Sequence, residues 1–281
     1  MKNTLVTSDL DRTLIYSRSA GGEAFARHET VCVEMYDGSP LSHMTLRSRE
    51  ILAALQEHAE LVPVTTRTPE QYGRVVLPGS GSRYAIASNG GAVLVDGERD
   101  PVWRGAVDAL VAELPASLED IVDRLGPLTE GWARLRVADG LFCYLVADHP
   151  PAHFVDRWRG HCVPLGWDVS QQGRKIYTVP RPATKEAAIA EVRRRLISEG
   201  RLAADARVLA AGDGMLDLGM LRAADAAIRP RHGELEAAGV TYDGLAVTAG
   251  AGLGAGEEIA RWFQINCTTV LPDEGVRACP L

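Results

Sequence analysis

The chain has 281 residues, 46% of them apolar, and a formal net charge of −7, which suits a globular protein with one large core or with a core and a smaller second domain. Basic residues are not clustered as nucleic-acid binding requires, and no apolar run reaches the roughly 18 residues of a membrane span. The five cysteines lack C-x-x-C spacing and Asp9 comes too early for a signal peptide, so we expect free thiols in a cytoplasmic protein.

Two carboxylates follow the first β-rich run, residues 5–8. Alternate residues of a strand share a face, so Asp9 and Asp11 could point into one site at the carboxyl end of a parallel sheet. Their repulsion raises one pKa unless a cation lies between them, and Mg²⁺ is a hard cation that suits carboxylate oxygens. The stretch suggests a nucleophilic carboxylate, a second carboxyl for proton transfer and a magnesium ion. The alternative is an N-cap and turn.

Strand and helix patterns alternate up to residue 90. Strands are predicted at 31–36, 61–67 and 84–88, a turn at 37–40, and helices over 45–59 and from Thr68, where a capping box begins. The strand that ends in Thr65 and Thr66 runs straight into the second helix, which places hydroxyl groups at the carboxyl edge of the sheet. Asn89-Gly90 closes the third strand.

Residues 91–180 have a different pattern, because hairpin signals replace the alternation. Asp139-Gly140 joins two β-rich runs and indicates an antiparallel pair. Within this segment we expect a hairpin at 93–97, helices near 106–114, 117–126 and 151–160, and strands at 133–137, 141–146 and 175–179. We therefore predict a core domain made of residues 1–90 and 181–281, with residues 91–180 inserted as a separate α+β domain.

The alternation resumes after residue 180. We predict a helix from Thr184 to 196 that stops at Gly200, strands at 207–211, 226–228 and 245–247, a helix after Gly212 to Asp217, and a glycine-rich loop over 250–256 that opens a helix at 257–263. Lys185 lies in the first turn of its helix, where the helix dipole disfavours a cation, so this position calls for a reason. The tail 266–281, with Cys267 and Cys279, carries no motif that we can interpret; two unrelated thiols are preferred there over a pair.

Four elements then stand just past a strand or at a helix start. D-x-D-x-T at residues 9–13, Thr65, Lys185 and G-D-x-x-x-D at residues 212–217 resemble the four motifs of the haloacid dehalogenase (HAD) superfamily. The insertion falls where this superfamily places its C2 cap, and Asn89-Gly90 resembles the Cof-like and sucrose-phosphatase-like sugar phosphatases. The resemblance implies an α/β fold, with a Rossmann-like parallel-sheet core and an inserted α+β C2 cap domain.

The resemblance also implies a role for each motif residue. Asp9 would be the nucleophile that forms an aspartyl-phosphate and would bind Mg²⁺, and Asp11 would be the general acid and then base, with its backbone carbonyl on the metal. Thr65 would bind the phosphoryl group and Lys185 would neutralise it. Asp213 and Asp217 would lie at the metal. The backbone N–H groups of Leu10 and Thr66 would surround the phosphate. Arg12 and Thr66 stand where this superfamily commonly has Gly.

The cap is expected to choose the leaving group. Arg134 and Arg136 share one face of a strand and Lys175 begins another, which suits an anionic or polyhydroxyl substrate; a solvated sheet face is the alternative. The predicted substrate contacts are Leu10, Arg12, Thr66, Asn89, Arg134, Arg136 and Lys175. Trp103, Trp132, Trp158 and Trp167 offer rings for sugar stacking, with core packing as the preferred interpretation.

We therefore expect a Mg²⁺-dependent phosphomonoester hydrolase that acts on a small phosphorylated metabolite, with sugar phosphates as the expected class. One alternative is a phosphohexomutase of the α-phosphomannomutase type, which shares the capped fold. Another is a catalytically silent binding or regulatory protein, against which the intact set of acids, threonine and lysine argues. The sequence carries no signal for the oligomeric state.

Overall fold

A five-stranded parallel sheet forms the centre of the computed structural model, which describes residues 1–79 and 81–268. β1 (Lys2–Ser8) lies between β12 (Leu202–Ala211) and β4 (Glu60–Pro63), and β13 (Ala226–Arg229) and β14 (Leu245–Val247) continue beyond β12. From Thr4 onward every residue of β1 is buried, as both-sided coverage by helices requires. The predicted α/β class with a parallel sheet is confirmed.

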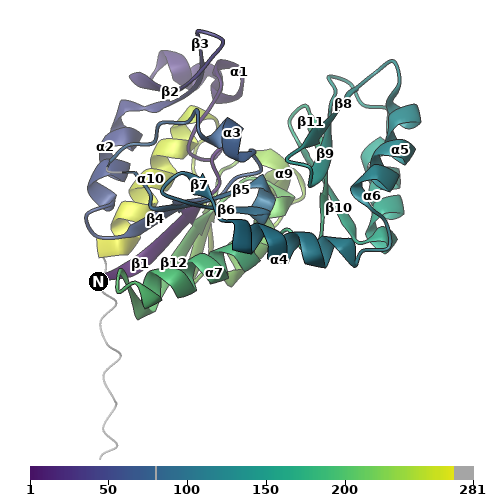
Figure 1. Cartoon of the computed structure of the whole chain (residues 1–281). Coiled ribbons are helices and arrows are strands. Elements are labelled where there is room, and N and C mark those ends of the chain that lie inside the picture. Colours follow the sequence, from purple (N-terminus) through teal and green to yellow (C-terminus); the bar gives the residue numbers. More distant parts are fainter. Residues whose placement is uncertain (80, 269–281) are drawn as a thin grey trace, which may run out of the picture.

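Helices cover both faces of this sheet (Figure 1). On one face α2 (Leu46–Leu55) and α10 (Leu253–Thr268) pack against Val6. On the other face α7 (Lys185–Ser198) packs against Leu5. The shorter helices of this unit are α8 (Leu218–Ala223), α9 (Gly233–Ala237), α3 (Pro69–Tyr72) and α1 (Arg18–Gly21).

Two predictions in the core need correction. Ser39 and Pro40 are not turn residues: they begin β3 (Ser39–Thr45), which pairs with β2 (Thr30–Tyr36), and the turn between them is Asp37-Gly38 alone. The glycine-rich stretch is not a loop throughout, since α10 begins at Leu253. A Cβ on Gly256 would lie 2.9 Å from the Tyr16 ring, so this glycine allows close packing inside a helix.

A small antiparallel sheet follows the core strands. It contains β5 (Tyr84–Ala87), β6 (Ala92–Val95) and β7 (Glu98–Arg99). The pairing of β5 with β6 crosses the domain boundary predicted at residue 90, and Val93 packs with the core helix α7. The division into residues 1–90, 91–180 and 181–281 therefore stays a prediction.

A second unit is built on a four-stranded antiparallel sheet, as the hairpin signals predicted. Its strands lie in the order β10 (Trp167–Gln172), β11 (Lys175–Pro180), β9 (Phe142–Val146) and β8 (Arg134–Ala138). Its helices are α4 (Pro101–Ala112), α5 (Leu118–Thr129) and α6 (Phe154–Cys162). Helices α5 and α6 cover one face, and the other face is turned toward the core (Figure 1). β10 was not predicted.

The aromatic and thiol groups of the second unit are mainly structural. Trp158 and Trp167 are buried in its core, and Trp103 and Trp132 pack against that core, so core packing is confirmed over sugar stacking.

Cys32, Cys143, Cys162 and Cys267 are free, while Cys279 lies outside the described residues. Between residues 1 and 268, apart from residue 80, no helix is long and apolar enough to cross a membrane.

Candidate active site

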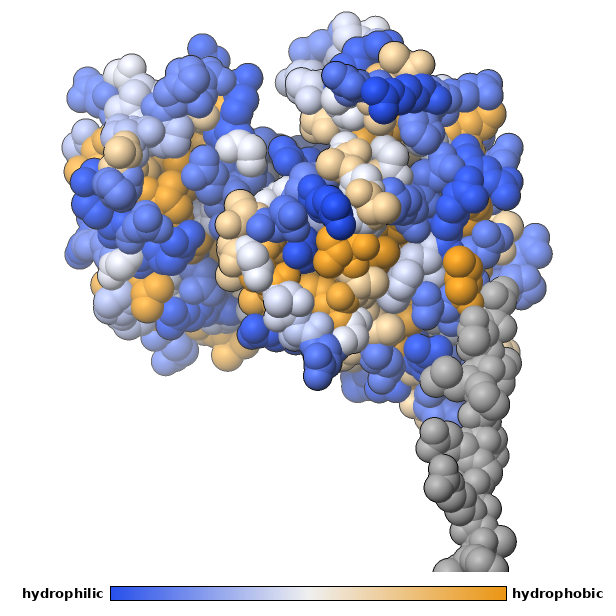
Figure 2. Space-filling model, turned by 180° about the vertical axis from the view of Figure 1, so that it is seen from behind, coloured by the Kyte–Doolittle hydropathy of each residue, from blue (hydrophilic) through white to orange (hydrophobic). Residues whose placement is uncertain are grey.

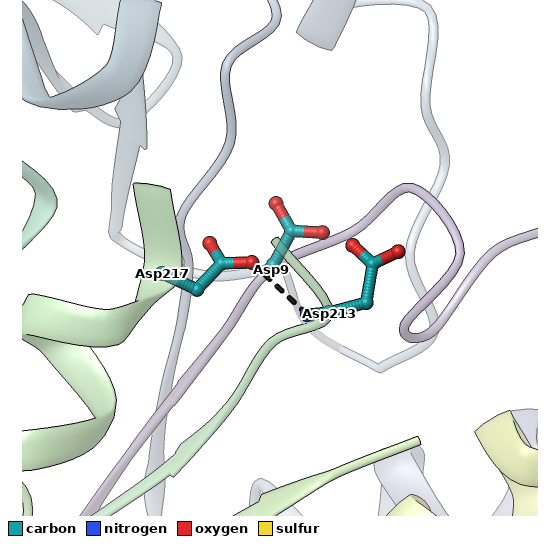
Figure 3. Close-up of side chains that lie close together, drawn as sticks. All are labelled: Asp9, Asp213 and Asp217. Atoms are coloured by element: carbon teal, nitrogen blue, oxygen red, sulfur yellow. Dashed lines mark hydrogen bonds between the residues drawn. The ribbon is translucent and has the colours of Figure 1, made fainter. Parts of the chain in front are cut away.

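The carboxyl ends of neighbouring strands bring the predicted acids together. Ser8 of β1 pairs with Ala211 of β12, so Asp9 and Asp213 follow adjacent strands, and Asp217 lies one turn further on. One carboxylate oxygen of each lies within 4.8 Å of the others, and all three residues are buried. Figure 3 shows these side chains around one space, with the backbone N–H of Asp213 bonded to Asp217.

Lys185 provides the cation of this cluster. Its Nζ donates to Asp9 Oδ1 over 2.7 Å and to the carbonyl of Val64 over 3.3 Å, and it also bonds Asp217. The side chain is fully buried. Burial acts to lower the pKa of Lys185, but the charges of Asp217 and Asp9 outweigh it and hold the pKa above its usual value. These partners explain a lysine in the first turn of α7.

The acids hold more negative charge than the nearby cations cancel. Burial raises the pKa of Asp9 to about 7, although Lys185 acts in the opposite direction. Burial, with the charges of Asp9 and Asp217, raises the pKa of Asp213 well above its usual value. Ionisation of all three carboxylates would leave one net negative charge against the ammonium of Lys185 and the guanidinium of Arg12, so a bound cation would favour it.

These donors fit a magnesium ion. Asp213 Oδ1 is buried and has no hydrogen-bond partner within the described chain, so a ligand position is open on it. Both oxygens of Asp217 are already used, one by Lys185 and the other by the N–H groups of Asp213 and Gly214 at 3.0 and 2.8 Å. Asp213 therefore offers an unused oxygen, and Asp9 Oδ2 accepts only one bond, from the Thr13 hydroxyl at 3.3 Å, while Asp217 positions the site.

Asp11 lies apart from the acid cluster, in a pair with Arg67. Arg67 donates to both oxygens of Asp11 over 2.7 and 2.8 Å, and its other side contacts the fully buried Glu34 at 2.9 Å. Burial acts to raise the pKa of Asp11, but the hydrogen bonds and charge of Arg67 outweigh it, so the pKa is below its usual value. Sequence reasoning missed Arg67 and Glu34; the position of Arg67 directly after Thr65 and Thr66 was the available signal.

The groups predicted to hold the phosphate are the Thr65 hydroxyl and two backbone N–H groups. Thr65 follows β4 and is fully buried, and its hydroxyl accepts from the N–H of Arg67 at 3.2 Å. The backbone N–H groups of Leu10 and Thr66 have no acceptor within the described residues, which leaves them for a ligand. Their contact with phosphate, and the choice of Thr65 over Thr66, stay predictions.

Arg12 has a backbone conformation that is typical of glycine, but its side chain carries a charge that the site uses. Its φ is 63°, the left-handed region where glycine is commonest. Its Nε lies 3.2 Å from Asp213 Oδ2 and so balances part of the acid cluster. Its carbonyl accepts from the Tyr16 hydroxyl and from His232 Nε2, both at 2.8 Å.

Two hydrogen bonds hold the ring of His232 in one tautomer. Its Nδ1 accepts from the N–H of Gly252 at 3.1 Å, so Nε2 carries the proton donated to the Arg12 carbonyl. Burial lowers the pKa of His232 below the usual 6.5. The folded state thus favours the neutral ring.

A pH dependence of stability follows for His232. Above pH about 6.5 the ring is neutral in both states, and below it the unfolded chain takes up the proton first, so the free energy of unfolding falls as the pH drops. Denaturant midpoints at pH 7.5 and 5.5 measure this decrease. His232→Gln keeps a donor and should reduce the decrease, whereas His58→Gln, at an exposed site, should not; equal decreases in all three proteins would contradict this role.

Asn89 and Gly90 hold the start of α7. Asn89 Nδ2 donates to the carbonyl of Ala183 over 2.9 Å, so its amide N–H is already engaged, while its Oδ1 is buried without a partner in the described chain. Gly90 has a φ of 97°, and a Cβ there would lie 2.0 Å from the carbonyl oxygen of Thr184. This close approach brings Gly90 against the backbone of Thr184 and Lys185 at the start of α7.

Gly90→Ala should therefore be strongly destabilising. We expect a loss at least about 2 kcal/mol larger than that of Gly97→Ala, because overpacking against Thr184 adds to the backbone strain that both sites share. Gly97 is the matched control: its φ is 87°, but a Cβ there would meet nothing within 4 Å. Urea denaturation of both variants measures the difference, and equal losses would rule out the contact with Thr184.

The second unit reaches the site through the β10–β11 hairpin. A Cβ on Gly214 would lie 2.2 Å from Gln172 Nε2, an atom that is buried without a partner among residues that the structure describes. A Cβ on Gly173 would lie 3.5 Å from Nη1 of Arg12, which is an ordinary contact distance. Sequence reasoning missed Gln172, because a polar residue at a hairpin turn carries no signal of its own.

A cavity of about 540 Å³ lies between this hairpin and the core. Asp11 and Arg67 line it from the core, and Lys175 and Tyr177 from the second unit. A notch also separates the two units in the space-filling view (Figure 2). Asn89, Arg134 and Arg136 do not line this cavity, so as substrate contacts they stay predictions.

Solved structures share this architecture. The chain matches the sucrose-phosphatase from Synechocystis sp., determined with sucrose and phosphate, at 15% identity and a TM-score of 0.62, over 94% of this chain and 98% of that one. It matches a trehalose-6-phosphate phosphatase related protein at 18% and 0.54, over 94% and 98%, and an HAD subclass IIB sugar phosphatase at 12% and 0.53, over 94% and 99%. No family model and no curated protein matches the chain. The chain therefore has the fold of the HAD superfamily phosphatases, as its motifs predicted.

Proposed function

We propose that this protein is a Mg²⁺-dependent phosphomonoester hydrolase that acts on a small phosphorylated metabolite of the sugar phosphate class. The observation that carries the proposal is the buried ammonium of Lys185 between Asp9 and Asp217, with Asp213 beside them. A structural ion pair needs only one acid for one lysine. The additional carboxylates are costly to bury and suit a site that binds a cation and a phosphate.

Asp9 is the proposed nucleophile. A carboxylate oxygen of Asp9 forms a bond to phosphorus while the ester bond breaks, and Asp11 gives its proton to the leaving oxygen. Asp11 then takes a proton from water, whose oxygen attacks phosphorus and releases phosphate from Asp9. The proton balance closes, because Asp11 loses and regains one proton in each cycle.

Other groups hold the phosphoryl oxygens and their charge. The Lys185 ammonium, the Thr65 hydroxyl and the N–H groups of Leu10 and Thr66 are the proposed donors. Magnesium, held by Asp9, Asp213 and the carbonyl of Asp11, with Asp217 in support, would neutralise charge on the phosphate. The carboxylates among these ligands are those whose negative charge the nearby cations do not fully balance.

Asp11 is placed to serve the leaving group, since its half-exposed carboxylate lines the cavity between the units. Its pair with Arg67 keeps it ionised, which suits the base of the second step. To act as the acid it must take up a proton, and an incoming phosphate dianion favours that uptake by raising its pKa.

The test is release of free phosphate from a panel of sugar phosphates and other small phosphomonoesters, with Mg²⁺ and with EDTA. The proposal predicts release from at least one compound with Mg²⁺ and none with EDTA. A phosphohexomutase would convert a hexose phosphate to its isomer, with a bisphosphate activator and without free phosphate. No turnover of any panel member by the folded protein would favour a binding protein instead.

A further inference from the structure

Three cations on the core-facing side of the second sheet have no acidic partner. Arg134 lies opposite Val146, and Val146 lies opposite Lys175, so both charged side chains share one face. Arg136 lies two residues along the same face. Within residues 1–79 and 81–268, no carboxylate lies within 4.0 Å of any of the three. This face therefore carries uncompensated positive charge.

The two core cations that line the cavity differ from these three, because each already pairs with an acid. Arg12 pairs with Asp213, and Arg67 pairs with Asp11 and Glu34. Among the described residues that line the cavity, the cation without an acidic partner that an entering anion meets is Lys175, on the second unit. Lys175 lines that cavity together with Asp11. Burial acts to raise the pKa of Asp11, and the charge of Lys175 adds to the larger effect of Arg67, which lowers it.

Two aromatic rings hold Lys175 in place over the cavity. Its Nζ lies 5.5 Å from the ring centre of Tyr144 and 5.9 Å from that of Tyr177. The two rings lie 5.6 Å apart and are tilted by 38°. A cation over such rings is positioned without being neutralised, and the ring faces offer apolar surface for a carbon skeleton.

We infer that the leaving group of the substrate carries its own anionic group, a carboxylate or a second phosphate, and that Lys175 binds it. The inference rests on the proposed hydrolase function. Lys175 is the specificity residue that lines the cavity with Asp11, and Arg134 and Arg136 extend the positive face along the sheet. The phosphoryl group transferred to Asp9 is held separately, by Lys185 and the other donors of the core.

Matched substrates test this inference. The pairs are 6-phosphogluconate with glucitol 6-phosphate, two open chains that differ at a carboxylate, and fructose 1,6-bisphosphate with fructose 6-phosphate, which differ at a phosphate. We expect kcat/KM to be at least about tenfold higher for the anionic member of one pair, which corresponds to about 1.4 kcal/mol. The pair that shows the preference identifies the anion as carboxylate or phosphate.

Variants assign the preference to the sheet face. Lys175→Met should remove most of the preference by lowering kcat/KM for the anionic substrate, and Arg136→Gln should reduce it. Arg157→Gln is the matched control, because it removes the same charge from the exposed side of α6, on the other face of the sheet. Thermal unfolding confirms that each variant is folded.

The outcomes separate the two proposals. If the two substrates with a neutral leaving group release phosphate as fast as their anionic counterparts, or faster, the inference is overturned and the hydrolase function stays intact. A preference that survives Lys175→Met and Arg136→Gln would also overturn it. Absence of release from these four compounds and from the whole panel would overturn the hydrolase function, and the inference with it.

Discussion

Asp9→Asn should lower the rate of phosphate release by at least about a thousand-fold, because the amide cannot form the acyl phosphate on which the two-step reaction depends. The substitution keeps the size of the side chain. Lys185 keeps its bond to Asp217, so the fold should survive. Steady-state release with Mg²⁺, on a compound that the wild-type protein hydrolyses, measures the effect.

Asp123→Asn is the control for Asp9→Asn, since Asp123 is exposed on α5. It makes the same chemical change far from the acid cluster and should retain wild-type turnover. Circular dichroism establishes that both variants are folded. An Asp9→Asn protein that keeps a tenth or more of the activity would mean that another group attacks phosphorus.

Lys185→Met should destabilise the protein by about 3–5 kcal/mol, the usual effect of removing one partner from a buried ionic group. Asp9 and Asp217 would be left as buried carboxylates with no cation between them. Phosphate release should fall at least about a hundred-fold, since the transferred group loses its ammonium donor. Denaturant unfolding and steady-state assays measure the two effects.

The pH dependence of Lys185→Met has a definite sign. The Asp9 pKa is already raised to about 7 with the lysine present, and without it the folded-state pKa is higher still. A carboxyl whose folded-state pKa exceeds its unfolded value gains stability as the pH falls, so the deficit should be smaller at pH 5 than at pH 8. Lys175→Met, which breaks no pair with an acid, should lose less than about 1 kcal/mol. A Lys185→Met protein as stable as wild type at pH 8 would contradict the paired cluster.

The acid cluster could be predicted from sequence because its geometry is local to strand ends. Asp9 and Asp213 each follow a buried β-rich run, and parallel neighbours bring such positions together whatever the rest of the chain does. Lys185 was identifiable from its unfavourable place at a helix start. Hairpin chemistry at Asp139-Gly140 likewise identified the antiparallel sheet of the second unit.

Features that depend on distant partners were beyond the sequence. The strand β10 alternates polar and apolar residues. Ser170 and Gln172 face the core domain, and the alternate residues pack with α6, so the strand depends on contacts on both faces. The link from Arg67 to Glu34 joins two separate elements, and nothing near Glu34 in the sequence indicates it. Gln172 reaches the site only because its hairpin lies against Gly214.

The most direct test of the central claim needs no knowledge of the substrate. Beryllofluoride binds aspartate carboxylates as a mimic of a phosphoryl group, so ¹⁹F NMR of the protein with beryllofluoride and Mg²⁺ reports on Asp9 itself. We predict a bound resonance that disappears with EDTA and in Asp9→Asn, and persists in Asp123→Asn. No bound resonance in the wild-type protein, or one that survives Asp9→Asn, would contradict the assignment of Asp9 as the phosphoryl acceptor.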